Sequence, residues 1–150
     1  MNSAGRHCFD ETHPVYQRIR AMLAVRAALP VLRHGRQYLR PLSILGAPFA
    51  ASGAGEILAW SRILDDEEAL CVVNTHGEHR RGADVLVDAT MNEVGCAFRV
   101  AINTAHAVEP SYEGTHPLGS ALATQTRDGL RFLEIRDLGP SEVLVLVNRR

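Results

Sequence analysis

A run of four acidic residues, DDEE at positions 65–68, is the densest group of carboxylates in the sequence. Paired carboxylates hydrolyse glycosidic bonds when they face each other across a substrate, at about 5 Å or at about 6.5–9.5 Å. Here the run lies between two apolar segments, Ile57–Leu64 and residues 69–73, a pattern that predicts a β-hairpin with a charged tip. Neighbouring side chains at a hairpin tip point in divergent directions. We therefore interpret the four acids as a solvated turn and not as an acid–base pair.

Histidines and cysteines are the residues that could bind a metal ion. His76 and His79 are three residues apart in an expected loop, and Cys71 is close to them in the sequence. Zinc sites need three or four ligands and usually show a second pair of ligands in the sequence, which is missing here. His7 and Cys8 are adjacent, so in an extended segment their side chains point apart and form no catalytic pair. We predict no metal and no cofactor.

Two aromatic residues could stack on a sugar ring. Trp60 is the only tryptophan, and because Leu58 and Leu64 share its strand phase we expect it to lie in a core or an interface. Tyr112, in the loop before Gly114, is the better exposed candidate. Aromatic residues make up only 5% of the chain, which is thin for a carbohydrate-binding platform. Weak α-glucan binding through Tyr112 or Trp60 remains an alternative.

The composition sets limits on partners and chemistry. A chain of 150 residues, 46% of them hydrophobic, fits one globular domain, and a net charge of −1 gives no reason to expect nucleic acid or an anionic membrane as a partner. All 16 basic residues are arginine, which excludes a lysine nucleophile. The sequence contains no GxSxG, GxxxxGK[ST], GxGxxG or HExxH motif. It has neither a signal-peptide pattern nor an apolar run of about 20 residues, so we predict a cytoplasmic location.

A helical pattern is confined to the first quarter of the chain. Thr12 could cap this helix, Pro14 suits its first turn, and Pro30 stops it. Its apolar face consists of Val15, Ile19, Met22, Leu23 and Leu29. The spacing predicts an amphipathic helix of about four turns.

Everything after Arg36 has the pattern of strands and turns. The candidate strands are residues 37–42, 56–64, 69–74, 83–89, 97–103, 121–126, 130–136 and 143–148. The segment Val143–Val147 is apolar at every position, so both of its faces should be covered. We predict a mainly β fold: an antiparallel Greek-key β-sandwich of about eight strands, preceded by one N-terminal α-helix. The expected division is an N-terminal segment, 1–35, and an all-β domain, 36–150.

Three stretches also resemble a known family, the α-amylase family of glycoside hydrolases. Residues 7–43, with HPVY, an Arg- and Ala-rich helix and LPVLRHGRQYLR, resemble the last barrel helix of such an enzyme and its entry into the C-terminal β-domain. The stretch ILAWSRILDDEEALCVVNTHGE, residues 57–78, is similar to the first long hairpin of that domain, and PSEVLVLVN, residues 140–148, resembles its last strand. The resemblance spans nearly the whole chain, from residue 7 to residue 148.

The resemblance covers only the C-terminal domain of these enzymes and not the part that carries the catalytic residues. Enzymes of this family have a catalytic (β/α)₈ barrel that carries a nucleophilic Asp, an acid/base Glu and a second Asp. Those motifs have no counterpart here, so no catalytic residue is assigned and the chain is not expected to be an enzyme on its own. The implied role is to pack on and stabilise the barrel of a parent glycoside hydrolase. The alternatives are a carbohydrate-binding module and a stand-alone interaction protein derived from a truncated enzyme gene.

The apolar face of the N-terminal helix needs a partner. Burying four or five of its side chains is worth roughly 6–15 kcal/mol, which rivals the stability of a typical domain. We therefore expect this face to contact a barrel, to fold onto the β-domain, or to pair with a second copy in a two-fold dimer.

Overall fold

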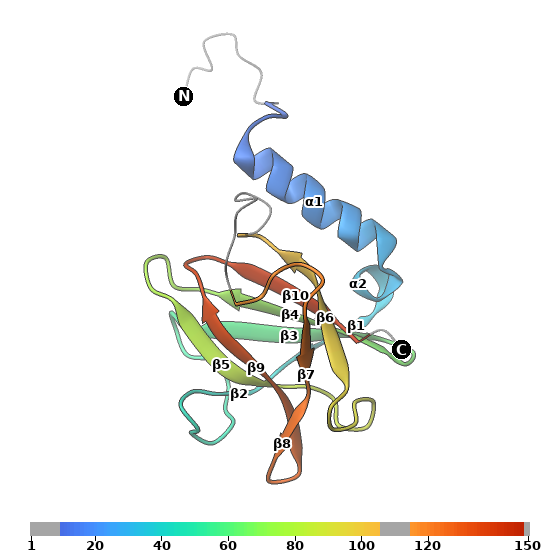
Figure 1. The fold of residues 1–150 in the computed structure, drawn as a ribbon, viewed down its shortest axis with the longest axis vertical. Coiled ribbons are helices and arrows are strands. Elements are labelled where there is room, and N and C mark those ends of the chain that lie inside the picture. The colour runs from blue at the N-terminus through green and yellow to red at the C-terminus, as the bar shows by residue number, and fades with distance from the viewer. Residues whose placement is uncertain (1–9, 106–114, 149–150) are drawn as a thin grey trace.

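The computed structural model describes residues 10–105 and 115–148 (Figure 1). Its helices are α1 (Pro14–Ala28) and α2 (Pro30–His34). Its strands are β1 (Arg36–Leu39), β2 (Leu42–Ser43), β3 (Ile57–Leu64), β4 (Glu67–Asn74), β5 (Arg81–Leu86), β6 (Ala97–Asn103), β7 (Ala121–Ala123), β8 (Gln125–Arg127), β9 (Leu130–Leu138) and β10 (Val143–Val147). None of the described helices is long and apolar enough to cross a membrane.

The strands form two antiparallel sheets packed face to face. The larger sheet has the order β1-β3-β4-β10-β6-β7, and the smaller has the order β2-β5-β9-β8. The main core lies between them and is built from alternate residues of the strands, for example Leu70 and Val72 of β4 against Val85 of β5 and Leu133 of β9. This arrangement confirms the predicted mainly β sandwich with an N-terminal helix.

Two of the predicted strands each divide between the sheets. Residues 37–42 become β1 in the larger sheet and β2 in the smaller one, with a break at Pro41, which has no N–H to donate to a ladder. Residues 121–126 become β7 and β8 around the buried Thr124, whose N–H donates to the Cys96 carbonyl (2.9 Å) and whose hydroxyl donates to the Glu93 carbonyl (2.5 Å). These crossings raise the number of described strands to ten.

The outer face of the larger sheet carries a second apolar cluster, which we call the helix-side cluster. Leu144 and Leu146 of β10 face the main core, whereas Val145 and Val147 face the helices, as the continuous apolar pattern of this strand predicts. The buried members of the helix-side cluster are Leu29, Val31, Ala69, Cys71, Ile102, Val145 and Val147, and half-buried Met22, Val25, Leu32, Trp60, Leu64 and Ala101 pack against them. The described chain thus has three layers: helices, larger sheet and smaller sheet (Figure 1).

The start of α1 and the segment after it differ in detail from the prediction. The capping side chain is His13, whose Nδ1 accepts from the Val15 N–H at 3.2 Å; the predicted cap, Thr12, instead donates to the Asp10 carboxylate. The first helix ends before Pro30 as predicted, but the chain then enters a second short helix, α2, which the sequence analysis did not predict. Gly35 follows directly and lets the end of α2 approach β3, since a Cβ there would lie 2.9 Å from the Ile63 carbonyl oxygen of β3.

The predicted apolar face of α1 is only partly covered by the β-domain. Leu29 is buried and Met22 half-buried against the helix-side cluster. Val15, Ile19 and Leu23 remain 52%, 48% and 57% exposed. The β-domain, one of the three partners expected for this face, therefore does not cover these three residues. The helix-side cluster contacts only part of the apolar face of α1, because the N-terminal half of α1 projects beyond the sheet (Figure 1).

Candidate functional site

The acidic run 65–68 is not uniformly solvated. Asp65 and Asp66 form the exposed turn, with Asp65 in a left-handed conformation (φ 51°), but β4 already begins at Glu67. Glu68 is fully buried because it shares the inward face of β4 with Leu70 and Val72. The interpretation of all four acids as a solvated turn is thus wrong for Glu68. The sequence pattern placed the start of this strand two residues too late, at the first apolar position, residue 69.

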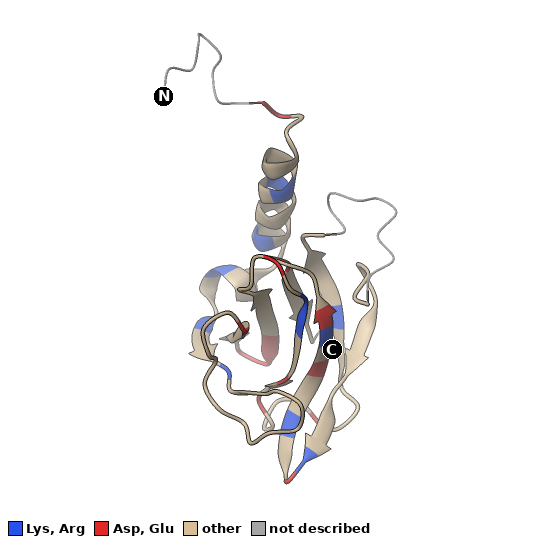
Figure 2. Ribbon diagram, turned by 90° about the vertical axis from the view of Figure 1, so that its left-hand side faces the viewer, with Lys and Arg blue, Asp and Glu red and all other residues tan. Residues whose placement is uncertain are grey.

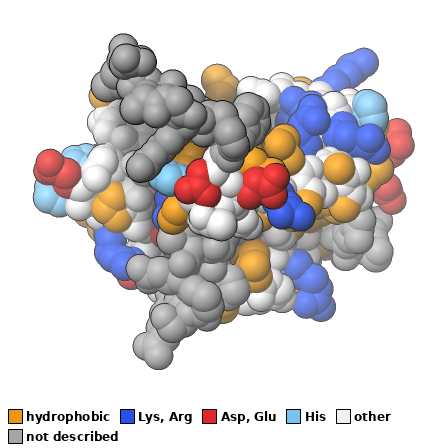
Figure 3. All heavy atoms as spheres, turned by 90° about the horizontal axis from the view of Figure 1, so that it is seen from above, with side chains coloured by type: hydrophobic (Ala, Val, Ile, Leu, Met, Phe, Trp, Pro, Cys, Tyr) orange, Lys and Arg blue, Asp and Glu red, His pale blue; other side chains and the backbone are white. Residues whose placement is uncertain are grey.

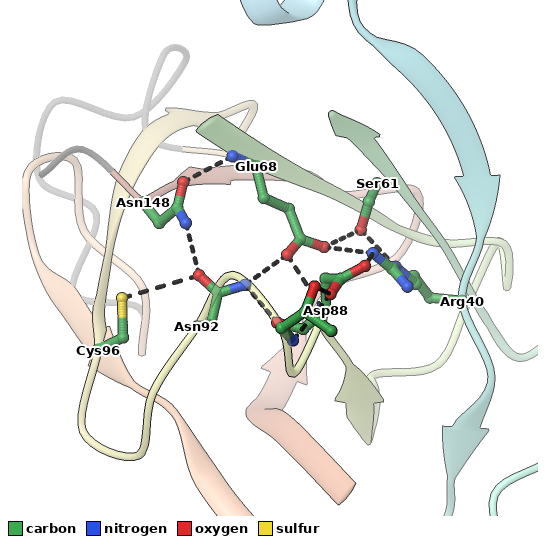
Figure 4. A network of polar contacts seen from close by, with 8 residues as sticks. Arg40, Ser61, Glu68, Asp88, Asn92, Cys96 and Asn148 are labelled. Atoms are coloured by element: carbon green, nitrogen blue, oxygen red, sulfur yellow. Dashed lines mark hydrogen bonds and ion pairs between the residues drawn. The ribbon is translucent and has the colours of Figure 1, made fainter. Parts of the chain in front are cut away.

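The Glu68 carboxylate accepts four hydrogen bonds (Figure 4). Its Oε1 accepts from Arg40 Nη2 at 2.8 Å and from the Ser61 hydroxyl. Its Oε2 accepts from the Asp88 N–H at 3.0 Å and from Asn92 Nδ2 at 2.6 Å. A buried carboxylate is tolerated when its charge is paired and its lone pairs are occupied, and both conditions hold here. Because protein donors occupy both oxygens, Glu68 acts as a structural centre and has no oxygen left for a substrate.

Further contacts extend this network to the end of the chain (Figure 4). The Glu68 N–H donates to Asn148 Oδ1 at 2.6 Å, and the amide group of Asn148 donates to Asn92 Oδ1. The pKa of Asp88 is held below its ordinary value, first by a hydrogen bond from the Thr90 hydroxyl and also by the Thr90 N–H, with Arg40 nearby. The network ties β4, the segment between β1 and β2, the loop after β5 and the residue after β10 to one another.

A second polar cluster lies on the outer face of the smaller sheet. Asp84 is buried and accepts from Arg127 Nη1 at 2.9 Å and from Arg136 Nη2. The Arg127 guanidinium stacks on Phe49 and Phe132, at 4.8 Å and 5.1 Å from the ring centroids. These contacts cover Phe132, which explains why β9 is apolar on both faces in this stretch.

A cavity of about 420 Å³ adjoins Asp84. It is lined by Leu45, Gly46, Arg80, Arg81, Gly82, Asp84, Arg136 and Asp137. Its two carboxylates are both ion-paired, Asp84 with Arg136 and Asp137 with Arg80 at 3.1 Å. The cavity therefore presents charge pairs to solvent and not a pair of free carboxylates.

The histidines and Cys71 occupy separate places. The rings of His76 and His79 lie 4.6 Å apart in the loop after β4, where His76 Nδ1 accepts from the backbone N–H groups of Glu78 and His79. Cys71 lies on β4 in the helix-side cluster, and burial raises the pKa of its thiol to about 12. Within residues 10–105 and 115–148, no three His, Cys, Asp or Glu side chains are grouped so that they could hold a metal ion.

The two predicted stacking residues differ in what the structure describes. Trp60 is half-buried on the outer face of the larger sheet, opposite Cys71, where it packs against the helix-side cluster. Tyr112 lies outside the described residues, as do His7 and Cys8. Sugar stacking by Trp60 or Tyr112 stays a prediction.

The helical end of the chain has a charge pattern that the motif search missed. Residues 12–55 contain no Asp or Glu but six arginines: Arg18, Arg20, Arg26, Arg33, Arg36 and Arg40. In Figure 2 the helix α1 carries only blue segments, with red at the turn before it. Figure 3, viewed from above, shows more basic side chains on the right of this face, among apolar ones, than on the left. The signal was available in the sequence as a 44-residue stretch without acids, which the near-zero net charge of the whole chain conceals.

Comparison with known proteins shows a likeness of fold. No family model matches the sequence, and no curated protein matches it. The crystal structure of CldA, a cyclomaltodextrin glucanotransferase with a three-domain ABC distribution, matches with a TM-score of 0.57 and 14% identity, over 97% of this chain and 24% of that chain. An inactive double mutant of MutB in complex with isomaltulose matches with a TM-score of 0.51 and 21% identity, over 92% of this chain and 18% of that chain.

The chain spans less than a quarter of the length of either neighbour. Both neighbours are α-amylase-family proteins, and the match corresponds to the C-terminal domain of that family. The resemblance to this β-domain, inferred from residues 7–148, is thereby confirmed as a likeness of fold.

Proposed function

We propose that this chain is the non-catalytic C-terminal β-domain of an α-amylase-like glycoside hydrolase, and that it packs on and stabilises a catalytic (β/α)₈ barrel. The observation that carries the proposal is the difference in how much of each chain is matched. The structural match covers 97% and 92% of this chain but only 24% and 18% of the two neighbours. A domain that accounts for so small a part of an enzyme leaves room elsewhere for the catalytic part.

The arrangement of charged groups supports a scaffolding role. The buried carboxylate of Glu68 is engaged by four protein donors, and that of Asp84 is paired with two arginines. Both clusters join segments that are distant in the sequence. In a longer protein, the uncovered part of α1, with Val15, Ile19 and Leu23, is the surface that we assign to the barrel contact.

Reading the coding sequence upstream of Met1 tests this function. We expect an in-frame segment that encodes a (β/α)₈ barrel with its Asp, Glu and Asp motifs. An in-frame stop codon directly upstream, or an upstream segment of another fold class, would overturn the proposal. Either of those results would favour a stand-alone interaction protein.

The carbohydrate-binding alternative has its own test. Trp60 is half-buried under the helices, and Tyr112 lies outside the described residues. Titration with maltoheptaose, followed by tryptophan fluorescence, separates the two functions. The scaffolding role predicts no change at millimolar sugar, whereas a saturable shift would favour a binding module.

A further inference from the structure

Arg18 lies on the side of α1 that faces the β-domain. Met22, Val25 and Leu29, which belong to the helix-side cluster or pack on it, follow Arg18 after four, seven and eleven residues, so the four side chains share one side of the helix. The stripe assigned to the barrel contact begins at Val15 and runs along the exposed side, so Arg18 does not belong to it. A charged side chain therefore stands where an apolar one would continue the packing face.

A cavity of about 250 Å³ lies next to Arg18, where α1 passes the end of β6 (Figure 1). Its lining also includes Arg80 from the loop after β4 and Thr104 directly after β6. Ser141 and Glu142, in the turn before β10, contribute further polar groups. Four segments that are distant in the sequence thus place polar side chains around one small space.

The guanidinium of Arg18 has no partner in the described part of the chain. Its Nε is buried without a hydrogen-bond partner, and the side chain forms no ion pair with residues 10–105 and 115–148. A buried donor of this kind costs free energy unless an acceptor reaches it. Arg80, on another wall of the cavity, uses only Nη1 for its contacts with Asp137 and keeps Nε and Nη2 as further donors.

The carboxylate in the cavity wall does not supply the missing acceptor. Glu142 is buried, and its Oε2 accepts from the Gly139 N–H at 2.6 Å. It forms no ion pair with Arg18 or Arg80. The acceptor that Arg18 needs therefore has to come from a group that is not part of the described chain.

Two hydroxyl groups add further donors. The Thr104 hydroxyl oxygen already accepts from the Val143 N–H at 2.8 Å, so its proton is left to donate, and the Ser141 hydroxyl can also donate. A space lined by two guanidinium groups and two hydroxyls suits a ligand that only accepts hydrogen bonds. We propose that the cavity binds a small oxyanion, a carboxylate or a phosphate, which joins α1 to the β-domain through Arg18 and Arg80.

Other ligands fit these groups less well. A cation would face two guanidinium groups and would find the carboxylate of Glu142 already engaged. A sugar ring would find no aromatic side chain in the lining on which to stack. An oxyanion accepts from planar guanidinium groups in their preferred bidentate geometry and lies between two like charges, which lowers their repulsion.

Calorimetric titration of the full chain, with inorganic phosphate in one arm and succinate in the other, tests the proposal. Both arms are run at constant ionic strength set with sodium chloride, so that general screening is the same throughout. We expect saturable one-site binding at millimolar anion. Tighter binding of phosphate would identify a phosphate ligand and tighter binding of succinate a carboxylate ligand, and either result supports the oxyanion site.

Three variants show where the anion binds. Arg18→Gln and Arg80→Gln, from two walls of the cavity, should each weaken binding at least about tenfold, because each removes a charge-assisted contact. Arg20→Gln is the matched control: it removes the same charge from the exposed Arg20 of α1, which does not face Arg18, and should change the affinity less than about twofold. Circular dichroism confirms that each variant is folded. No saturable binding of either anion, or binding that Arg18→Gln leaves intact, would overturn the proposal. No barrel takes part, so these outcomes leave the proposed function untouched.

Discussion

The buried side chain of Glu68 is the centre of the polar network that connects β4, the segment between β1 and β2 and the loop after β5. Its carboxylate is fully buried and is neutralised by Arg40 at 2.8 Å, while Ser61, Asn92 and the backbone of Asp88 supply the remaining donors. Removing one partner of a buried ion pair leaves the charge of the other partner unpaired and away from water, which destabilises the fold.

We expect Glu68→Gln to lower the free energy of unfolding by about 3 kcal/mol. The amide removes the charge that faces Arg40 and turns an N–H₂ group toward existing donors. Urea denaturation followed by circular dichroism measures the loss. The control is Asp66→Asn at the exposed turn, which should change stability by less than about 0.5 kcal/mol. Equal stability of the two variants would show that the network is dispensable.

Asp88 gives a prediction about pH. Its pKa lies below the ordinary value of 3.8, mainly because the Thr90 hydroxyl donates to it at 2.6 Å. A lowered folded-state pKa contributes stability that is present above the unfolded value and is lost as the pH falls through the folded value. Thr90→Val should therefore raise the pKa of Asp88 toward 3.8 and leave that of Asp10 unchanged. Carboxyl NMR titration checks this, and an unmoved Asp88 pKa would exclude the Thr90 hydroxyl as the cause.

At the scale of elements, the helices belong to the same packed unit as the larger sheet. Val31 of α2 is fully buried in the helix-side cluster with Val145 and Val147 of β10. The packing is therefore continuous across the predicted division at residues 35 and 36, and the division itself stays a prediction.

We expect Val31→Ala to cost on the order of 2 kcal/mol, through lost burial and the cavity left behind. The loss should appear in a single cooperative transition, seen alike by far-UV circular dichroism and Trp60 fluorescence. Val94→Ala, at an exposed loop position, serves as the neutral control. Separate transitions for helix and sheet would instead support two independent units.

The sequence predicted elements better than it predicted where they break or end. Alternation identified the long strands, and the continuous apolar run of β10 predicted its two covered faces. The crossings at Pro41 and Thr124 were missed, because alternation continues through a strand that changes sheets. Glu68 was missed for a related reason: a charged side chain at a strand end gives no local sign that Arg40, 28 residues away, compensates its burial.

At the scale of the whole molecule, the fold resembles a small part of two larger proteins. The likeness covers nearly all of this chain and under a quarter of each neighbour. The paired state of Asp84 and the enclosure of Glu68 agree with a domain that supports chemistry performed elsewhere.

The isolated chain should release no reducing sugar from starch or maltooligosaccharides. Hydrolysis needs two carboxyls facing a bound glycoside, whereas the buried carboxylates described here are engaged by the protein itself. A reducing-sugar assay with protein purified to homogeneity checks this. Activity that co-purifies with the chain and is abolished by an Asp84→Asn substitution would contradict it.

The thermal stability of the barrel, with and without this domain, tests the account most directly. The proposed parent enzyme, if it carries a barrel upstream of Met1, would be compared with a version lacking residues 36–150, by calorimetry and by residual glycosidase activity after heating. The account predicts that deletion lowers the unfolding temperature of the barrel by several degrees or more, while the catalytic groups remain on the barrel. A barrel that unfolds at the same temperature and stays equally active without these residues would contradict a packing and stabilising role.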